Sequence, residues 1–338
     1  MTQSDFPYLR LRLIVRPLRE SRDRHSRGSR RGVPAGNPLP ATQLRRVLGK
    51  AFVDLLCPFG RPRCQDWPSL RGAKGRAKAH ELCPQARQCA YGVYFAASDS
   101  LRPPFALFVR PDPADGGAQQ IEVTLFGSNW RLYPWMVGGL ARALDGGIGK
   151  RRGRWRIESV AQVVPGGTHR LCGGDLATLP TALQPDSIPI SRATLLESFE
   201  SRRQPSLEVR LLSPTRLLHD GRVLTGAAPV PLSLLVARTL DRLHGLYGDR
   251  ARQLLPQELE PLLDREAGRV PVVRARTCWV AQKDYSARFR REIRLDGKMG
   301  DLVYGQGAER FLPILKAGEI LHVGKNVTSG CGRIAVVG

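Results

Sequence analysis

The chain has 338 residues, and its 53 lysines and arginines exceed its 30 aspartates and glutamates, for a formal net charge of +23. Arginine accounts for 45 of the basic residues and lysine for eight. The planar guanidinium fits phosphate and stacks on bases. This excess therefore excludes an acidic small metabolite as a sufficient explanation and indicates a polyanion, with nucleic acid as the first partner to consider.

The length fits two domains of ordinary size. No apolar run approaches the ~20 residues that a membrane helix needs, and arginines interrupt the apolar stretch at 9–15, unlike in a signal peptide. We therefore expect a cytoplasmic protein with no membrane partner. In that reducing compartment its seven cysteines would be thiols or metal ligands rather than disulfides.

The first predicted elements are a strand, an arm and a helix. Leucine and arginine alternate over residues 9–13, which predicts a half-buried strand. Residues 16–31 contain seven arginines and His25, a composition that predicts an exposed arm. Apolar residues from 44 to 56 recur at intervals of three and four, which predicts an amphipathic helix. Further along we expect a cysteine-rich insertion at 57–92, strands at 107–110 and 121–126, a helix at 132–144, a glycine loop at 146–150 and a strand from Trp155.

The same order of elements returns in the second half. Residues 166–204 contain glycine, proline and serine clusters that predict a linker. After it we expect a strand at 207–211, a helix from Pro231, strands at 270–282 and 290–295, a helix at 307–316, a strand at 319–323, a glycine-rich turn at 324–332 and a strand at 334–337.

Strand–helix–strand–strand–helix–strand is the ferredoxin-like unit. The predicted fold is therefore of the α+β class, with two tandem ferredoxin-like (RRM-like) domains. The first covers residues 1–165 and contains the cysteine-rich insertion at 57–92. The second covers residues 205–338 and contains the glycine-rich loop.

The glycine-rich loop can be interpreted in two ways. Glycines permit positive φ, and successive free amides form a nest that binds anions. Lys325 and Arg333 add charge there and Thr328 and Ser329 add hydroxyls, so the loop could hold an RNA phosphate. The alternative is a tight turn with ordinary solvated cations.

The run from Leu312 to Arg333 resembles the glycine-rich signature of the CRISPR repeat-processing endoribonucleases, members of the RAMP superfamily of tandem ferredoxin-like proteins. Three weaker pieces are also similar to that family. They are residues 48–52 with the cysteines that follow and Cys89–Gly92, the segment Ser213–Leu217, and the segment Asp284–Arg288, in which Asp284 departs from the family pattern.

The resemblance implies an endoribonuclease that binds the repeat hairpin of precursor CRISPR RNA and cuts it once to give mature guide RNA. Such enzymes need no metal or other cofactor for catalysis. The 2′-hydroxyl attacks the adjacent phosphate and leaves a 2′,3′-cyclic phosphate. The product-bound protein could join other subunits of a CRISPR effector complex. The alternative is a non-catalytic RAMP subunit that binds guide RNA without cutting it.

The candidate catalytic residues are His25, His322 and Lys50. Histidine suits acid–base catalysis because its pKa lies near ~6.5, and Lys50 could stabilise the charge of the transition state. The alternatives are a solvated His25 and a His322 packed under the glycine-rich loop. The candidate RNA contacts are Arg45, Arg46, Lys150, Arg151, Arg152, Arg154, Tyr285, Arg288, Gly324, Lys325, Thr328, Ser329, Gly330, Gly332 and Arg333.

Four cysteines form a separate group that could bind a structural zinc ion. Their spacing is wider than in common zinc sites, so free thiols are the alternative. A zinc-stabilised DNA-binding regulator is a further alternative, although no helix-turn-helix or known finger spacing supports it. The four candidate ligands are Cys57, Cys64, Cys83 and Cys89.

Overall fold

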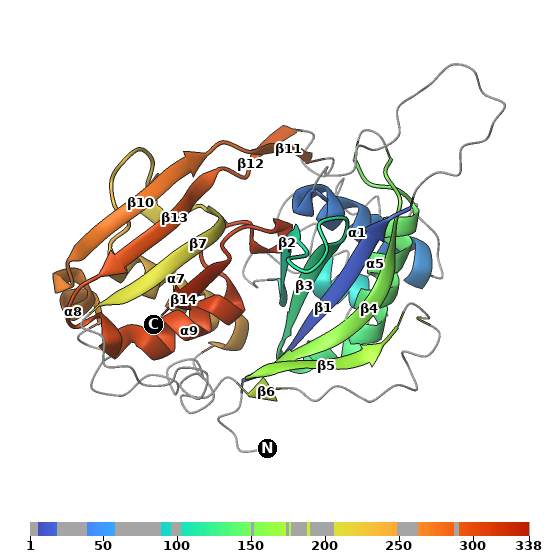
Figure 1. Ribbon diagram of the computed structural model, residues 1–338, viewed down its shortest axis with the longest axis horizontal. Helices are drawn as coiled ribbons and strands as arrows, with labels where there is room; N and C mark the ends of the chain where they lie inside the picture. Colours follow the sequence, from blue (N-terminus) through green and yellow to red (C-terminus); the bar gives the residue numbers. More distant parts are fainter. Residues whose placement is uncertain are drawn as a thin grey trace, which may run out of the picture.

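Two antiparallel sheets lie side by side, each with helices packed against it (Figure 1). Within the described part of the chain, no helix is long and apolar enough to cross a membrane. The computed structural model describes residues 6–18, 39–57, 89–95, 103–149, 152–173, 176, 188–189, 206–248, 263–286 and 291–337.

The N-terminal sheet has the strand order β2-β3-β1-β4-β5. Leucines on β1 point into the core, whereas Arg10 and Arg12 lie on the opposite face of the strand, as the alternation predicted. The apolar face of α1 packs on the same core. The elements are β1 (Pro7–Pro17), α1 (Ala41–Leu56), α4 (Ala90–Phe95), β2 (Phe105–Pro111), β3 (Gln119–Phe126), η1 (Gly127–Leu132), α5 (Tyr133–Asp145), β4 (Trp155–Val164), β5 (Gly167–Cys172) and β6 (Ile188–Pro189).

The C-terminal sheet has the strand order β10-β13-β7-β14. A two-stranded hairpin, β11–β12, extends from it toward α1 (Figure 1). The elements are β7 (Leu207–Thr215), β8 (Leu218–His219), β9 (Arg222–Val223), α7 (Leu232–Tyr247), α8 (Leu263–Arg269), β10 (Val272–Val280), β11 (Lys283–Ser286), β12 (Arg291–Arg294), β13 (Gly297–Tyr304), η4 (Ala308–Phe311), α9 (Leu312–Leu321), η5 (Val327–Ser329) and β14 (Ile334–Val337).

Both sheets contain the ferredoxin-like order, in which the first strand lies between the third and the fourth. The prediction of an α+β chain with antiparallel sheets is therefore confirmed. Most of the predicted insertion, residues 58–88, lies outside the described part of the chain.

Two local predictions are corrected. The range 166–204, predicted as a linker, supplies two strands to the first sheet: β5 pairs with β4, and β6 pairs with the start of β1. The strand predicted at 319–323 is wrong, because α9 continues to Leu321 and ends at His322, whose φ is +61°. The short apolar run there fits the period of a helix as well as that of a strand. The structure has a helix, whose residues pack into two different clusters of the core.

The two domains share a buried interface. Phe6 and Phe126 of the first domain pack with Leu243 and Leu321 of the second. The buried guanidinium of Arg242 donates hydrogen bonds to the carbonyl oxygens of Leu321 at 2.6 Å and of Phe105, in the other domain, at 3.2 Å. This interface brings the C-terminal loop close to the first helix.

Candidate nucleic-acid interface

Helix α1 begins at Ala41, directly after Pro40, and no described side chain caps its first turn. The first amides of a helix lack partners within the helix and carry a partial positive charge. An anion can bind at such an end without displacing a capping side chain. The residues around this turn therefore define the candidate interface.

The glycine-rich loop contacts α1 at two points. A Cβ atom at Gly330 would collide with the Cβ of Ala41, so the loop backbone touches the first residue of the helix. One turn along the helix, the Nε of Arg45 donates a hydrogen bond of 2.7 Å to the hydroxyl oxygen of Thr328. The last loop of the chain is thus docked on the first helix.

The glycines allow close approach of the backbone inside this loop. Gly324 has a φ of +89°, and a Cβ there would lie 2.5 Å from the carbonyl oxygen of Arg216. Gly332 has a φ of +76°, and a Cβ there would collide with the carbonyl oxygen of Val323. Both conformations strain any other residue. The glycine pattern is thus explained by packing.

The loop amides are mostly bonded within the protein, partly to carbonyl oxygens of the loop itself and partly to the segment that ends β7. Lys325 donates its backbone N–H to Arg216 at 3.2 Å, and Gly332 donates to Pro214 at 3.1 Å. Arg333 donates its backbone N–H to the hydroxyl of Ser213 at 2.9 Å. The geometry therefore favours the tight-turn interpretation over an open nest of amides, and it gives the Ser213–Leu217 motif a role in holding the loop.

The predicted RNA contacts in the loop differ in their exposure. Gly324 and Lys325 reach the surface. The guanidinium of Arg333 lies in the interior, where little of its surface remains for a phosphate. The other four predicted contacts of the loop are also buried: Thr328, Ser329, Gly330 and Gly332.

Two exposed cations lie on α1, the helix that contacts both this loop and the β11 strand. Arg46 and Lys50 are both exposed. The Nη1 of Arg46 lies 4.0 Å from the carboxylate of Asp284, and the neighbouring Tyr285 has half of its surface exposed. The structure thus brings together predicted RNA contacts from α1, from β11 and from the glycine-rich loop.

The turn between α5 and β4 approaches the first turn of α1. A Cβ at Gly149 would lie 3.3 Å from the Oε1 of Gln43. Arg152 is exposed in this turn, and the exposed Arg154 is paired with the carboxylate of Asp145. The turn therefore adds two guanidinium groups to the candidate interface. That of Arg152 has no ion pair among the described residues, and that of Arg154 is partly neutralised by Asp145.

His322 lies beneath the surface. Its side chain is buried, and its Nδ1 has no hydrogen-bond partner among the described atoms. The ring contacts Phe108 edge-on, with centroids 6.5 Å apart. Burial, assisted by the positive charges of Arg333 and Arg242, lowers the pKa of His322 well below its ordinary value. His322 is therefore a neutral interior group in this structure.

Several predicted site residues lie outside the described part of the chain. Cys57 follows α1 and Cys89 precedes α4, but their proposed partner cysteines are not described, so the zinc site stays a prediction. The residues outside the description are His25, Cys64, Cys83, Lys150, Arg151 and Arg288.

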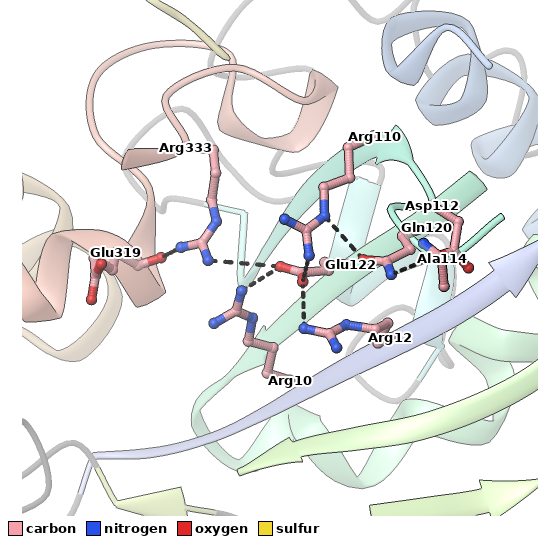
Figure 2. Close-up of polar contacts among 9 residues, drawn as sticks. All are labelled: Arg10, Arg12, Arg110, Asp112, Ala114, Gln120, Glu122, Glu319 and Arg333. Carbon is pink, nitrogen blue, oxygen red and sulfur yellow. Dashed lines mark hydrogen bonds and ion pairs between the residues drawn. The ribbon is translucent and has the colours of Figure 1, made fainter. Parts of the chain in front are cut away.

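The sequence interpretation missed an ion-pair cluster on the N-terminal sheet. Glu122 lies at its centre and is paired with four arginines (Figure 2). A single carboxylate inside the apolar run 121–126 was the available signal, because a buried carboxylate requires partners.

Two parts of the chain match sequence profiles of known proteins. Residues 209–334 match the sequence profile of the CRISPR-associated endoribonuclease Cas6, and residues 37–182 match a profile described as an N-terminal domain. The first match covers the glycine-rich signature and confirms its resemblance to the CRISPR repeat-processing endoribonucleases. No curated protein is significantly similar in sequence.

A solved structure of a Cas6 protein is similar in fold. A Cas6 product complex from Thermus thermophilus has a TM-score of 0.52 at 14% identity, with 98% of this chain and 100% of that chain covered. A structure recorded as Thermus thermophilus Cas6 has a TM-score of 0.49 at 15% identity, with 98% and 99% covered. At 14% identity, the similarity to the product complex shows the fold alone.

Proposed function

We propose that this chain binds the repeat hairpin of precursor CRISPR RNA and cuts it once, because its residues 209–334 match the profile of the CRISPR-associated endoribonuclease Cas6. The docking of the glycine-rich loop on α1 carries this proposal. It joins two residues that are 283 positions apart in the sequence, near the place where the connection that contains His25 enters the helix.

The RNA backbone would lie across the start of α1, which no described side chain caps. Arg46 and Lys50 are exposed along α1 and Lys325 is exposed on the glycine-rich loop, and these cations would neutralise phosphates. The exposed ring of Tyr285, at the β11 edge of the same surface, offers a platform for an unpaired base. Helix amides and separate cations, rather than an open loop nest, would form the phosphate site.

The reaction would need no metal, because protein side chains can supply each role. A base removes the proton of the 2′-hydroxyl, the 2′-oxygen bonds to phosphorus, and the bond from phosphorus to the 5′-oxygen breaks. An acid gives a proton to that 5′-oxygen. The products are a 2′,3′-cyclic phosphate and a 5′-hydroxyl. Cations beside the phosphate stabilise its extra negative charge.

We assign the base role to His25 and the charge-stabilising role to Lys50. His322 is a poorer base, because its buried nitrogen is remote from solvent and has no described partner through which to pass a proton. The connection that contains His25 enters α1 at Ala41, which contacts Gly330.

The purified protein should be incubated with repeat RNA from its own genome in EDTA. A single cut whose upstream product resists phosphatase until mild acid opens the cyclic phosphate supports the proposal. His25→Ala should slow cleavage on the order of 100-fold or more. Tight binding without any cut would favour the non-catalytic RAMP subunit instead.

A further inference from the structure

Glu122 on β3 lies among four guanidinium groups (Figure 2). Its Oε1 accepts a hydrogen bond from Arg12 at 3.1 Å and lies 3.9 Å from Arg110. Its Oε2 pairs with Arg10 and lies 3.7 Å from the Nη2 of Arg333. One carboxylate thus faces four positive charges.

This carboxylate is charged although it is buried. Its side chain is 4% exposed. Burial alone would raise the pKa of Glu122, but the charges of Arg10 and Arg333, together with the hydrogen bond from Arg10, lower the pKa to about 2. A buried ion pair that loses one partner leaves the other charge uncompensated. Loss of the Glu122 carboxylate would therefore leave the positive charges of the surrounding arginines uncompensated.

Arg333 differs from the other three described partners because it comes from the C-terminal domain. Arg10 and Arg12 lie on β1 and Arg110 lies on β2, beside Glu122 in the same sheet. Arg333 lies directly after the glycine-rich loop, and its guanidinium also donates to the carbonyl oxygen of Glu319. One of the four ion pairs therefore crosses between the domains.

The glycine-rich loop is thus held from the N-terminal domain at two positions. Arg45 binds Thr328 in the middle of the loop, and Glu122 binds Arg333 at its end. The exposed residue Lys325 lies on the same loop. A movement of the loop would displace Lys325 relative to the cations of α1.

We propose that Glu122 is a positioning residue that, through Arg333, fixes the glycine-rich loop against the N-terminal domain and so places Lys325 relative to Arg46 and Lys50. The effect on cleavage rests on the proposed function, whereas the effect on the loop does not. Reacting groups that are misplaced by about 1 Å can lose on the order of 100-fold in rate.

The test compares Arg333→Gln with Arg12→Gln. Both variants remove one guanidinium from the same carboxylate, but only the first removes an interdomain contact. Hydrogen exchange of the backbone amides at 323–333 measures the loop itself. Single-turnover cleavage and RNA affinity are measured in parallel.

Arg333→Gln should speed amide exchange of the loop and slow single-turnover cleavage on the order of tenfold, with RNA affinity changed by less than about threefold. Arg12→Gln should leave loop exchange and cleavage within about twofold of the wild type. Glu122→Gln should act as Arg333→Gln does.

Equal effects of the two arginine variants, or a loop whose exchange is unchanged in Arg333→Gln, would overturn the proposal. If Glu122→Gln fails to fold, the comparison of Arg333→Gln with Arg12→Gln still tests the proposal. If the wild type binds RNA but never cuts, the proposed function fails, and the exchange measurement still decides whether Glu122 positions the loop.

Discussion

The Nε of Arg45 in the first helix donates a hydrogen bond of 2.7 Å to the hydroxyl of Thr328 in the last loop. Thr328→Val keeps the shape of the side chain but removes the acceptor. We expect it to lower the free energy of unfolding by about 1–3 kcal/mol, because the guanidinium loses a buried partner. Urea unfolding measures this change. Thr328→Ser retains the hydroxyl and should stay close to the wild type; equal losses in both variants would contradict the role of the hydrogen bond.

Gly330 tests the contact between the loop and the helix. Gly330→Ala introduces a Cβ at a φ of +89° that collides with Ala41. Gly166 is a matched control, because its φ is +80° and a Cβ there meets nothing within 4 Å. Both alanine variants carry the strain of positive φ, but only Gly330→Ala adds overpacking. We expect its free energy of unfolding to fall by about 1–3 kcal/mol more than that of Gly166→Ala.

Equal losses of unfolding free energy in the two glycine variants would show that the loop shifts away from Ala41 at no measurable cost in stability. The docking of the loop on Ala41 would then not be a rigid contact.

Glu122 predicts a dependence of stability on acid pH. Its pKa is about 2 in the folded protein and about 4.5 when unperturbed, so the unfolded chain binds the proton first as the pH falls. The contribution is complete above about pH 4.5 and is lost as the pH falls toward 2. It amounts to about 3 kcal/mol. Unfolding free energies of Glu122→Gln should therefore decline less between pH 5 and pH 2; a decline equal to that of the wild type would exclude Glu122 as a source.

The exposed cations of α1 predict a change in the salt dependence of RNA binding. The logarithm of the binding constant falls linearly as the logarithm of the salt concentration rises. Arg46→Gln and Lys50→Gln should each reduce the magnitude of this negative slope by about one. Arg265 is exposed on α8, at the far end of the C-terminal domain, and Arg265→Gln is the control (Figure 1). Equal changes in all three variants would indicate diffuse attraction instead of a defined surface.

The sequence predicted the elements whose pattern is local. Alternation at 9–13 predicted β1, and the apolar spacing from 44 to 56 predicted α1, because period and burial are both encoded within each segment. The repeated order of elements then predicted both sheets. The pairing of β5 with β4 was missed because residues 166–204 have no strong period of their own.

The candidate site was predicted less well, because its geometry depends on contacts between distant segments. The glycines at 324–332 predicted a special backbone conformation, but the burial of Thr328 and Arg333 results from docking on the other domain. The interior position of His322 depends on Phe108, which is more than 200 residues away in the chain. Glu122 was missed for the same reason, since its partners come from three separate segments.

The identity of the nucleophile tests the proposed cleavage mechanism most directly. Repeat RNA with a single 2′-deoxy nucleotide immediately upstream of the cut site should be compared with unmodified RNA, both in EDTA, by binding and by single-turnover cleavage. We predict equal affinity within about twofold, one cut in the unmodified RNA and no cut in the deoxy RNA, because the attacking 2′-oxygen is missing. Cleavage of the deoxy RNA at the same position would contradict the proposed attack by the 2′-oxygen, since another nucleophile would then break the bond.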